Sequence, residues 1–173
     1  TRTRILNNGY IKSKYLDDKL CVAQILSYIK FLKDNRLKPK TDLYVYFSNY
    51  EEIGHGVSVF PEDLDEFIAV DIGLVAGEDA HGDEKKMQII AKDSRSTYDF
   101  TLRKKLQETA DKNGIKYTVG VYNRYGSDAT TAILQGFDFK YACIGPNVDA
   151  THHYERCHND GIIETVKLLI AYL

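Results

Sequence analysis

The stretch Phe67-Ile68-Ala69-Val70-Asp71-Ile72-Gly73, residues 67–73, decides the fold. Its apolar and β-branched residues predict a buried strand, and that strand ends on an acid. Burying Asp71 without a partner would cost on the order of several kcal/mol. The sequence therefore indicates that this carboxylate meets a partner in the folded protein.

Strands and helices are predicted to alternate on both sides of this stretch. Further strands are predicted at residues 43–46, 87–91, 117–122 and 139–145, and Asn8-Gly9 predicts a turn between two short extended pieces. Helices are predicted at about 18–34, from Ser96 or Thr97 to about Lys112 before Asn113-Gly114, in a short piece closed by Gly136, and at about 160–172. This alternation predicts a layered α/β fold with a largely parallel sheet.

Length and composition describe an ordinary globular chain. Its 173 residues suit one domain with a sizeable core, and the formal net charge of −2 argues against nucleic acid or an anionic membrane as a partner. The three cysteines, Cys21, Cys143 and Cys157, do not form a disulfide framework, which favours a reducing compartment. No apolar run approaches transmembrane length, so the cytosol is the expected location.

A second unusual stretch is Phe47-Ser48-Asn49-Tyr50-Glu51-Glu52-Ile53-Gly54-His55-Gly56, which follows the predicted strand at 43–46. Adjacent carboxylates repel each other, and burial raises the pKa of each. A divalent cation would remove this penalty, so that one glutamate could bind metal while its neighbour handles protons. The alternative is a solvated strand end.

Several polar residues are placed where a predicted strand or helix meets a loop. They are Asp17, Glu51 with Glu52, Asp71 and His152. Ligands gather at the carboxyl ends of strands in α/β sheets, and carboxylates with an imidazole suit Zn²⁺, Co²⁺ or Mn²⁺. Acids outnumber histidines, which is compatible with a two-metal site that shares one carboxylate. Asp17 has a competing interpretation as a helix N-cap.

Five short motifs in this order resemble the glutamyl/deblocking metallo-aminopeptidases. They are Leu16-Asp17-Asp18-Lys19, Ser48-x-x-Glu51-Glu52-Ile53-Gly54, Ala69-Val70-Asp71-Ile72-Gly73, Gly126-Ser127-Asp128-Ala129 and His152-x-Tyr154-Glu155-Arg156. Members of that family are dinuclear cytosolic enzymes that form tetrahedral particles, and some have been called endoglucanases. The resemblance implies a three-layer, zinc-peptidase-like sandwich with a mixed sheet.

The resemblance also implies a role for each metal-binding position. Asp17 corresponds to the carboxylate that bridges two divalent ions, Zn²⁺ or Co²⁺ with Mn²⁺ as an alternative. Glu52 and His152 correspond to further ligands of one ion, and Asp71 to a ligand of the other.

Catalytic and substrate positions follow in the same way. Glu51 corresponds to the general base, which takes a proton from metal-activated water and returns it to the leaving amine. Gly126, Ser127 and Asp128 correspond to a loop near the substrate pocket. The implied activity removes N-terminal residues from peptides, and the implied assembly of the intact protein is a homo-dodecamer.

The segment around His152 departs from the more usual family pattern. A subgroup with His-x-Tyr-Glu-Arg favours His152 over His153 as the ligand, and His158 stays open as an alternative. Glu155 and Arg156 are expected to form an ion pair beside the site. His55 and His81 are expected to lie at the surface or behind the ligands.

Two family features are absent: an upstream His-x-Asp motif and a small inserted β-rich domain. Residues 1–173 are therefore expected to be the C-terminal portion of a catalytic domain that lacks its first strands. One metal site would keep Asp17, Glu52 and His152, and the other only Asp17 and Asp71. We expect weak metal binding, little or no activity and an exposed sheet edge for this piece alone.

Two other functions compete with the peptidase interpretation. A glycoside hydrolase could use paired carboxylates, but it needs two carboxyl groups that flank one glycosidic bond. Neighbouring residues of a strand point to opposite faces, so adjacent carboxylates fit this requirement poorly. A non-catalytic assembly subunit would keep the fold without the chemistry.

Overall fold

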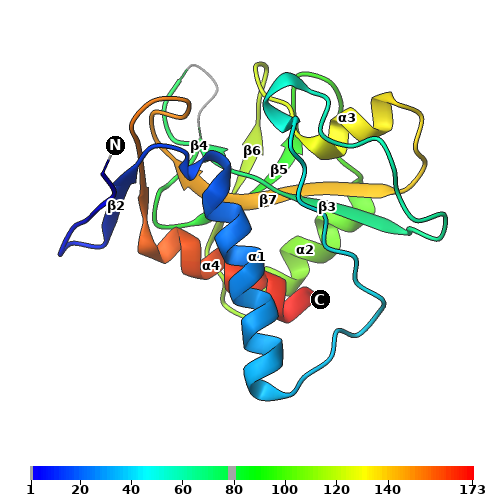
Figure 1. Cartoon of the computed structure of the whole chain (residues 1–173), viewed down its shortest axis with the longest axis horizontal. Helices are drawn as coiled ribbons and strands as arrows, with labels where there is room; N and C mark the ends of the chain where they lie inside the picture. Colours follow the sequence, from blue (N-terminus) through cyan, green and yellow to red (C-terminus); the bar gives the residue numbers. More distant parts are fainter. Residues whose placement is uncertain (1, 78–80) are drawn as a thin grey trace.

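A mixed β-sheet runs through the molecule with helices on both of its faces (Figure 1). The computed structural model describes residues 2–77 and 81–173. The main path of the sheet has the order β3 (Glu66–Val70), β7 (Lys140–Val148), β5 (Met87–Lys92) and β6 (Tyr117–Val121). A short strand, β4 (Gly73–Leu74), pairs with the end of β7. The predicted strands at 67–73, 87–91, 117–122 and 139–145 are thus confirmed.

The sheet consists of two parallel pairs joined by an antiparallel one. β3 is parallel to β7 and β5 is parallel to β6, whereas β5 and β7 are antiparallel. Because β3 and β7 are parallel, their carboxyl ends meet at one edge of the sheet. Asp71 follows β3, and the loop that contains His152 follows β7.

Helices cover the two faces of the sheet and complete three layers. They are α1 (Leu16–Asn35), α2 (Phe100–Lys112), α3 (Asp128–Leu134) and α4 (Asn159–Tyr172), with a 3-10 turn η1 at Glu51–Ile53. Side chains of α1, α2 and α4 pack with Ile89 and Ile144 on one face. Ala129 of α3 packs with Ile90 and Cys143 on the other. Neighbouring strand residues, such as Ile89 and Ile90, thus point to opposite faces, and each face of the sheet has its own core.

A small antiparallel sheet joins the N-terminal segment to the segment after β7. It has the order β1 (Arg4–Ile5), β2 (Tyr10–Ser13) and β8 (Glu155–His158). The predicted turn at Asn8-Gly9 connects β1 to β2, and Gly9 has a φ of 88°, which favours glycine. The pairing of β2 with β8 brings the start of α1 close to His152.

The predicted strand at residues 43–46 is wrong. Tyr44, Val45 and Tyr46 are exposed, and this segment belongs to no strand. A strand needs a neighbour for its backbone N–H and C=O groups. Within the described part of the chain, no strand pairs with this segment, and β3 is an edge strand that pairs only with β7.

The predicted helix start at Ser96 or Thr97 is also wrong, whereas the helix itself is confirmed. Asp99 is the N-cap of α2, and its carboxylate accepts the backbone N–H of Leu102 at 2.7 Å. The Ser96 hydroxyl instead contacts the Thr97 carbonyl oxygen at 3.2 Å. Among the helices that the structure describes, none is long and apolar enough to cross a membrane.

Leu106 tests the core between the sheet and α2. It is fully buried, whereas Leu134 of α3 is 66% exposed. We expect Leu106→Ala to lower the free energy of unfolding by about 2–5 kcal/mol, because it leaves a cavity. Leu134→Ala is the control and should have little effect in urea denaturation. Equal losses in the two variants would contradict the burial of Leu106 between α2 and the sheet.

Tyr172 tests the attachment of α4 to β3. Its hydroxyl donates to Glu66 at 2.6 Å, and Lys105 contacts the other oxygen at 3.0 Å. Burial alone raises the pKa of Glu66, but these hydrogen bonds outweigh it and lower the pKa below the ordinary value. The ionised carboxylate therefore stabilises the fold above its unfolded-state pKa, and this stabilisation is lost as pH falls through its folded-state pKa.

We therefore expect Tyr172→Phe to destabilise the protein more at neutral pH than in acid. Tyr154→Phe is the control, because the Tyr154 hydroxyl donates to the carbonyl oxygen of Arg2 at 3.0 Å and not to a carboxylate. Urea denaturation at several pH values measures both. A loss for Tyr172→Phe that stays constant with pH would contradict the role of the Glu66 carboxylate.

Candidate metal centre

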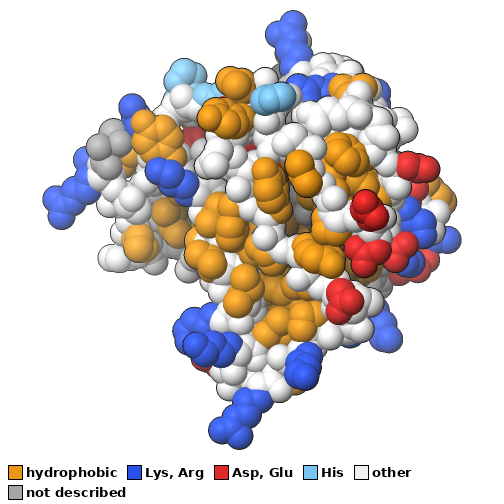
Figure 2. Space-filling model, turned by 45° about the vertical axis from the view of Figure 1, so that its right-hand side comes forward, with side chains coloured by type: hydrophobic (Ala, Val, Ile, Leu, Met, Phe, Trp, Pro, Cys, Tyr) orange, Lys and Arg blue, Asp and Glu red, His pale blue; other side chains and the backbone are white. Residues whose placement is uncertain are grey.

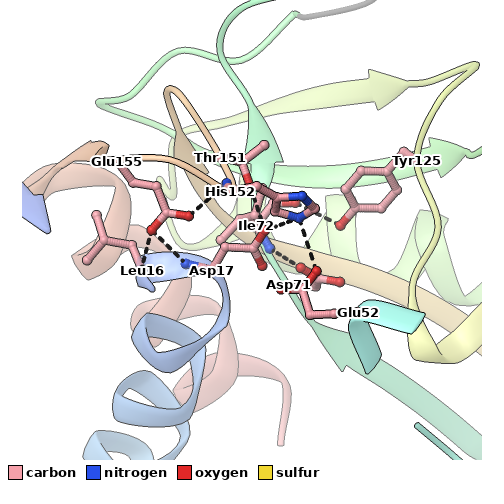
Figure 3. A network of polar contacts seen from close by, with 9 residues as sticks. All are labelled: Leu16, Asp17, Glu52, Asp71, Ile72, Tyr125, Thr151, His152 and Glu155. Carbon is pink, nitrogen blue, oxygen red and sulfur yellow. Dashed lines mark hydrogen bonds and ion pairs between the residues drawn. The ribbon is translucent and has the colours of Figure 1, made fainter. Parts of the chain in front are cut away.

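Four segments that are distant in sequence meet at the edge of the sheet where β3 and β7 end. Asp17 comes from the start of α1, Glu52 from η1, Asp71 from the end of β3 and His152 from the loop between β7 and β8 (Figure 3). The convergence of Asp71 and His152 follows from the parallel pairing of β3 with β7. These predicted ligand positions are therefore neighbours in space.

The first group of potential ligands consists of Asp17, Glu52 and His152. Their ligand atoms all lie within 4.8 Å of one another. Nε2 of His152 lies 3.0 Å from Oε2 of Glu52 and 3.3 Å from Oδ2 of Asp17. The side chains of His152 and Glu52 are 64% and 53% exposed, whereas that of Asp17 is only 10% exposed. The group is thus anchored on Asp17 and open to solvent.

Asp17 also belongs to a second group with Asp18 and Asp71, whose ligand atoms lie within 4.8 Å of one another. Asp18 was not among the ligands predicted from the sequence, although it belongs to the Leu16-Asp17-Asp18-Lys19 motif. The backbone at Asp17 and Asp18 is non-helical, with φ/ψ of −80°/107° and −118°/24°. Helical periodicity therefore does not apply here, and consecutive carboxylates can face one site. The only sequence indication was the pair of adjacent acids.

The electrostatics of the second group favour a cation. Burial raises the pKa values of Asp18 and Asp71 well above their ordinary range, and the neighbouring carboxylates raise them further. Oδ1 of Asp18 is buried and has no hydrogen-bond partner among the described residues. Oxygen donors with one imidazole nearby, and a buried oxygen without a donor, fit a divalent metal ion.

Glu51 lies beside both groups on η1. Its pKa is raised to about 7, mainly by burial and also by the carboxylates of Asp128, Glu52 and Asp17, against the lowering effect of Arg95. A carboxylate with such a pKa can both accept and release a proton near neutral pH.

The predicted ion pair between Glu155 and Arg156 is wrong. Arg156 binds Glu84 at 2.7 Å and Asp149 at 3.1 Å instead. Successive residues of β8 point to opposite sides, so these two side chains diverge. The Glu155 carboxylate accepts backbone N–H groups of the two segments that bear Asp17 and His152 (Figure 3).

The segment Gly126, Ser127 and Asp128 lies at the start of α3. Ser127 is buried, forms a capping box with Thr130 and contacts the Tyr98 hydroxyl at 2.8 Å. Oδ2 of Asp128 accepts a hydrogen bond from the Ser48 hydroxyl at 2.5 Å. The start of α3 is thereby joined to the segment that leads into Glu51.

The remaining histidines lie outside the two groups. His158 is buried, and its Nδ1 accepts the backbone N–H of Asp160 at 3.1 Å, so that it caps α4. His55, His81 and His153 are exposed. Among the described residues, His152 is thus the imidazole that lies with the acids.

Known proteins are similar to this chain in sequence and in fold. "Putative aminopeptidase YhfE" of Bacillus subtilis (strain 168) is 39% identical over 173 residues, which cover 99% of this chain and 50% of YhfE. Aminopeptidase APDkam598 of the archaeon Desulfurococcus kamchatkensis superposes with a TM-score of 0.86 at 20% identity, over 99% of this chain and 50% of that one.

The TET1 peptidase of Pyrococcus horikoshii, which can assemble into a tetrahedron or a large octahedral shell, superposes with a TM-score of 0.77 at 24% identity, over 98% of this chain and 52% of that one. At these identities the likeness to solved structures shows the fold. The chain spans about half the length of these relatives. The model of the M42 glutamyl aminopeptidases matches residues 1–168, and the chain therefore belongs to the M42 glutamyl aminopeptidase family.

Proposed function

We propose that this chain is part of a metal-dependent aminopeptidase that removes N-terminal residues from peptides. The observation that carries the proposal is the meeting of Asp17, Glu52 and His152, with Glu51 beside them, from three separate segments. A carboxylate cluster of this kind opposes folding unless a cation or another function compensates for it. Membership of an aminopeptidase family supports removal of N-terminal residues as the reaction.

Two divalent ions are proposed, with Asp17 as their shared ligand because it belongs to both groups. Glu52 and His152 would complete the protein ligands of one ion, and Asp71 would hold the other with Asp18 close to it. Zn²⁺, Co²⁺ and Mn²⁺ all suit oxygen ligands with one imidazole. When bound, such ions polarise a carbonyl group and lower the pKa of water.

The proposed role of Glu51 is proton transfer. Its carboxylate would accept a proton from the attacking water and return it to the nitrogen of the leaving amine, so that no proton is gained or lost overall. Asp128 and Ser48 hold the start of α3 against the Glu51 segment. Gly126, Ser127 and Asp128 are thereby proposed to line the approach of the peptide.

Residues 1–173 are proposed to be the C-terminal portion of this catalytic domain. Relatives are about twice as long, and β3 has a free edge within the described part of the chain. Hydrophobic side chains also cover much of the face in Figure 2. The large exposed hydrophobic residues include Leu26, Ile29, Tyr44, Val45, Tyr46 and Phe47. The rest of the polypeptide would cover such a surface.

The intact protein is proposed to act in the cytoplasm as a homo-oligomer, a dodecamer. The assembly of the TET1 peptidase of Pyrococcus horikoshii supports an oligomer. The three cysteines are buried and free, in keeping with a reducing compartment.

His152 provides a direct test of the metal site, with its neighbour His153 as the matched control. We expect His152→Ala to weaken Co²⁺ binding to the chain by more than about 10-fold in isothermal titration calorimetry, because the variant loses a ligand. His153 is exposed and outside both groups, so His153→Ala should bind Co²⁺ like the unmodified chain. Equal affinities of the two variants would refute the assignment of His152.

Glu51→Gln tests the catalytic proposal in the full-length protein. Loss of the base should lower kcat for a chromogenic aminoacyl anilide by about 10²–10⁴-fold, while the metal content measured by mass spectrometry stays unchanged. Glu108→Gln, on the exposed part of α2, is the control and should retain full activity. Unchanged turnover in Glu51→Gln would refute the role of Glu51. The 173-residue chain alone should show little or no activity.

A further inference from the structure

Glu155 is a buried carboxylate that has no role in the proposed reaction. Only 1% of its surface is exposed. It lies on β8, where it pairs with Ser13 of β2. A buried carboxylate is unfavourable unless donors satisfy it, and every donor described for Glu155 is a backbone N–H group.

Those donors come from two of the three segments that carry proposed ligands of one ion, the segments of Asp17 and His152. Oε2 accepts the N–H of Leu16 in a short hydrogen bond and that of Asp17 at 3.3 Å, whereas Oε1 accepts the N–H of His152 at 3.2 Å (Figure 3). Leu16 and Glu155 are 139 positions apart in the sequence. One side chain therefore connects the backbone at the start of α1 to the backbone after β7.

The backbone of His152 has an unfavourable conformation that such hydrogen bonds can stabilise. Its φ is 65°, in the left-handed region that residues with a side chain seldom adopt. Residues in this region persist when the surroundings hold them there. The hydrogen bond from the His152 N–H to Glu155 is one such restraint, and it fixes the direction in which the imidazole leaves the backbone.

We propose that Glu155 is a positioning residue for the metal centre. It sets the separation of Asp17 and His152 through their backbone N–H groups and does not bind the ion itself. Its own oxygens are already occupied by those donors, and it is not a member of either ligand group. This inference rests on the proposed metal-dependent function. Groups that orient metal ligands in this way typically contribute about 10–100-fold to metal affinity.

Glu155→Gln tests the proposal with little change of size. The amide keeps one acceptor oxygen, so only one of the two segments retains its hydrogen bond, and the NH2 group meets an N–H donor at the other. We expect Co²⁺ binding to the 173-residue chain to weaken by about 10–100-fold. The visible absorption spectrum of bound Co²⁺ should also change, because it reports the ligand geometry.

The matched control is Glu164→Gln on α4. Glu164 is also buried, and its Oε2 accepts the backbone N–H of Lys116 at 2.9 Å, but it lies outside both ligand groups. Melting temperatures without metal should fall in both variants. Only Glu155→Gln should change the Co²⁺ affinity and spectrum, which a merely structural role would leave unaltered.

The outcomes separate this inference from the function on which it rests. If the unmodified chain binds no Co²⁺, the metal site itself is refuted. If it binds Co²⁺ and Glu155→Gln binds with the same affinity and spectrum, the role of Glu155 is refuted while the metal site stands.

Hydrogen exchange of the unmodified chain gives a second test, which does not depend on whether a variant folds. The amide protons of Leu16, Asp17 and His152 should exchange slowly, because Glu155 accepts them. Fast exchange at His152 together with Asp17 would also overturn the proposal.

Discussion

Five consecutive residue pairs, from Glu66 with Lys140 to Val70 with Ile144, hold β3 parallel to β7. This ladder brings the carboxyl ends of the two strands to one edge of the sheet, so that Asp71 and the His152 loop start from neighbouring positions. The pairing of β2 with β8 then brings in the start of α1 with Asp17. Without the parallel ladder, the ligand segments would have no common edge at which to meet.

The same edge collects negative charge, which the fold has to accommodate. Carboxylate oxygens of Asp17, Asp18 and Asp71 lie within 4.8 Å of one another, and burial raises the pKa values of Asp18 and Asp71. Backbone N–H groups satisfy Glu155, whereas Oδ1 of Asp18 has no donor in the described part of the chain. A bound cation would offset this repulsion, so metal binding and folding stability are expected to be coupled.

The exposed apolar segment at 44–47 is linked to the metal centre through the residues that follow it. The segment leads through Ser48 into η1, which carries Glu51 and Glu52. Ser48 is held by Asp128 at 2.5 Å, but the residues before it form no strand. A strand that paired with this segment would also restrain η1. The low activity proposed for residues 1–173 alone would then have a second physical cause besides the lack of a metal ligand, namely a poorly restrained η1.

The amino-acid sequence by itself determined the elements whose apolar pattern is local. The helical spacing of Val22, Ile25 and Ile29 predicted α1, and apolar runs predicted β3, β5, β6 and β7. An acid at the end of such a run singled out Asp71, and the order of five motifs predicted the family. Local patterns show which faces are apolar, and this is sufficient to locate helices and buried strands.

Only the tertiary structure decided which elements pair and where each polar group finds its partner. It left residues 43–46 without a strand neighbour, set β7 antiparallel to β5, and placed Asp18 with Asp17 and Asp71. It also directed Glu155 to backbone donors up to 139 positions away, and not to Arg156 beside it. The physical reason is that hydrogen-bond partners depend on distances between remote segments, and local periodicity contains no information about those distances.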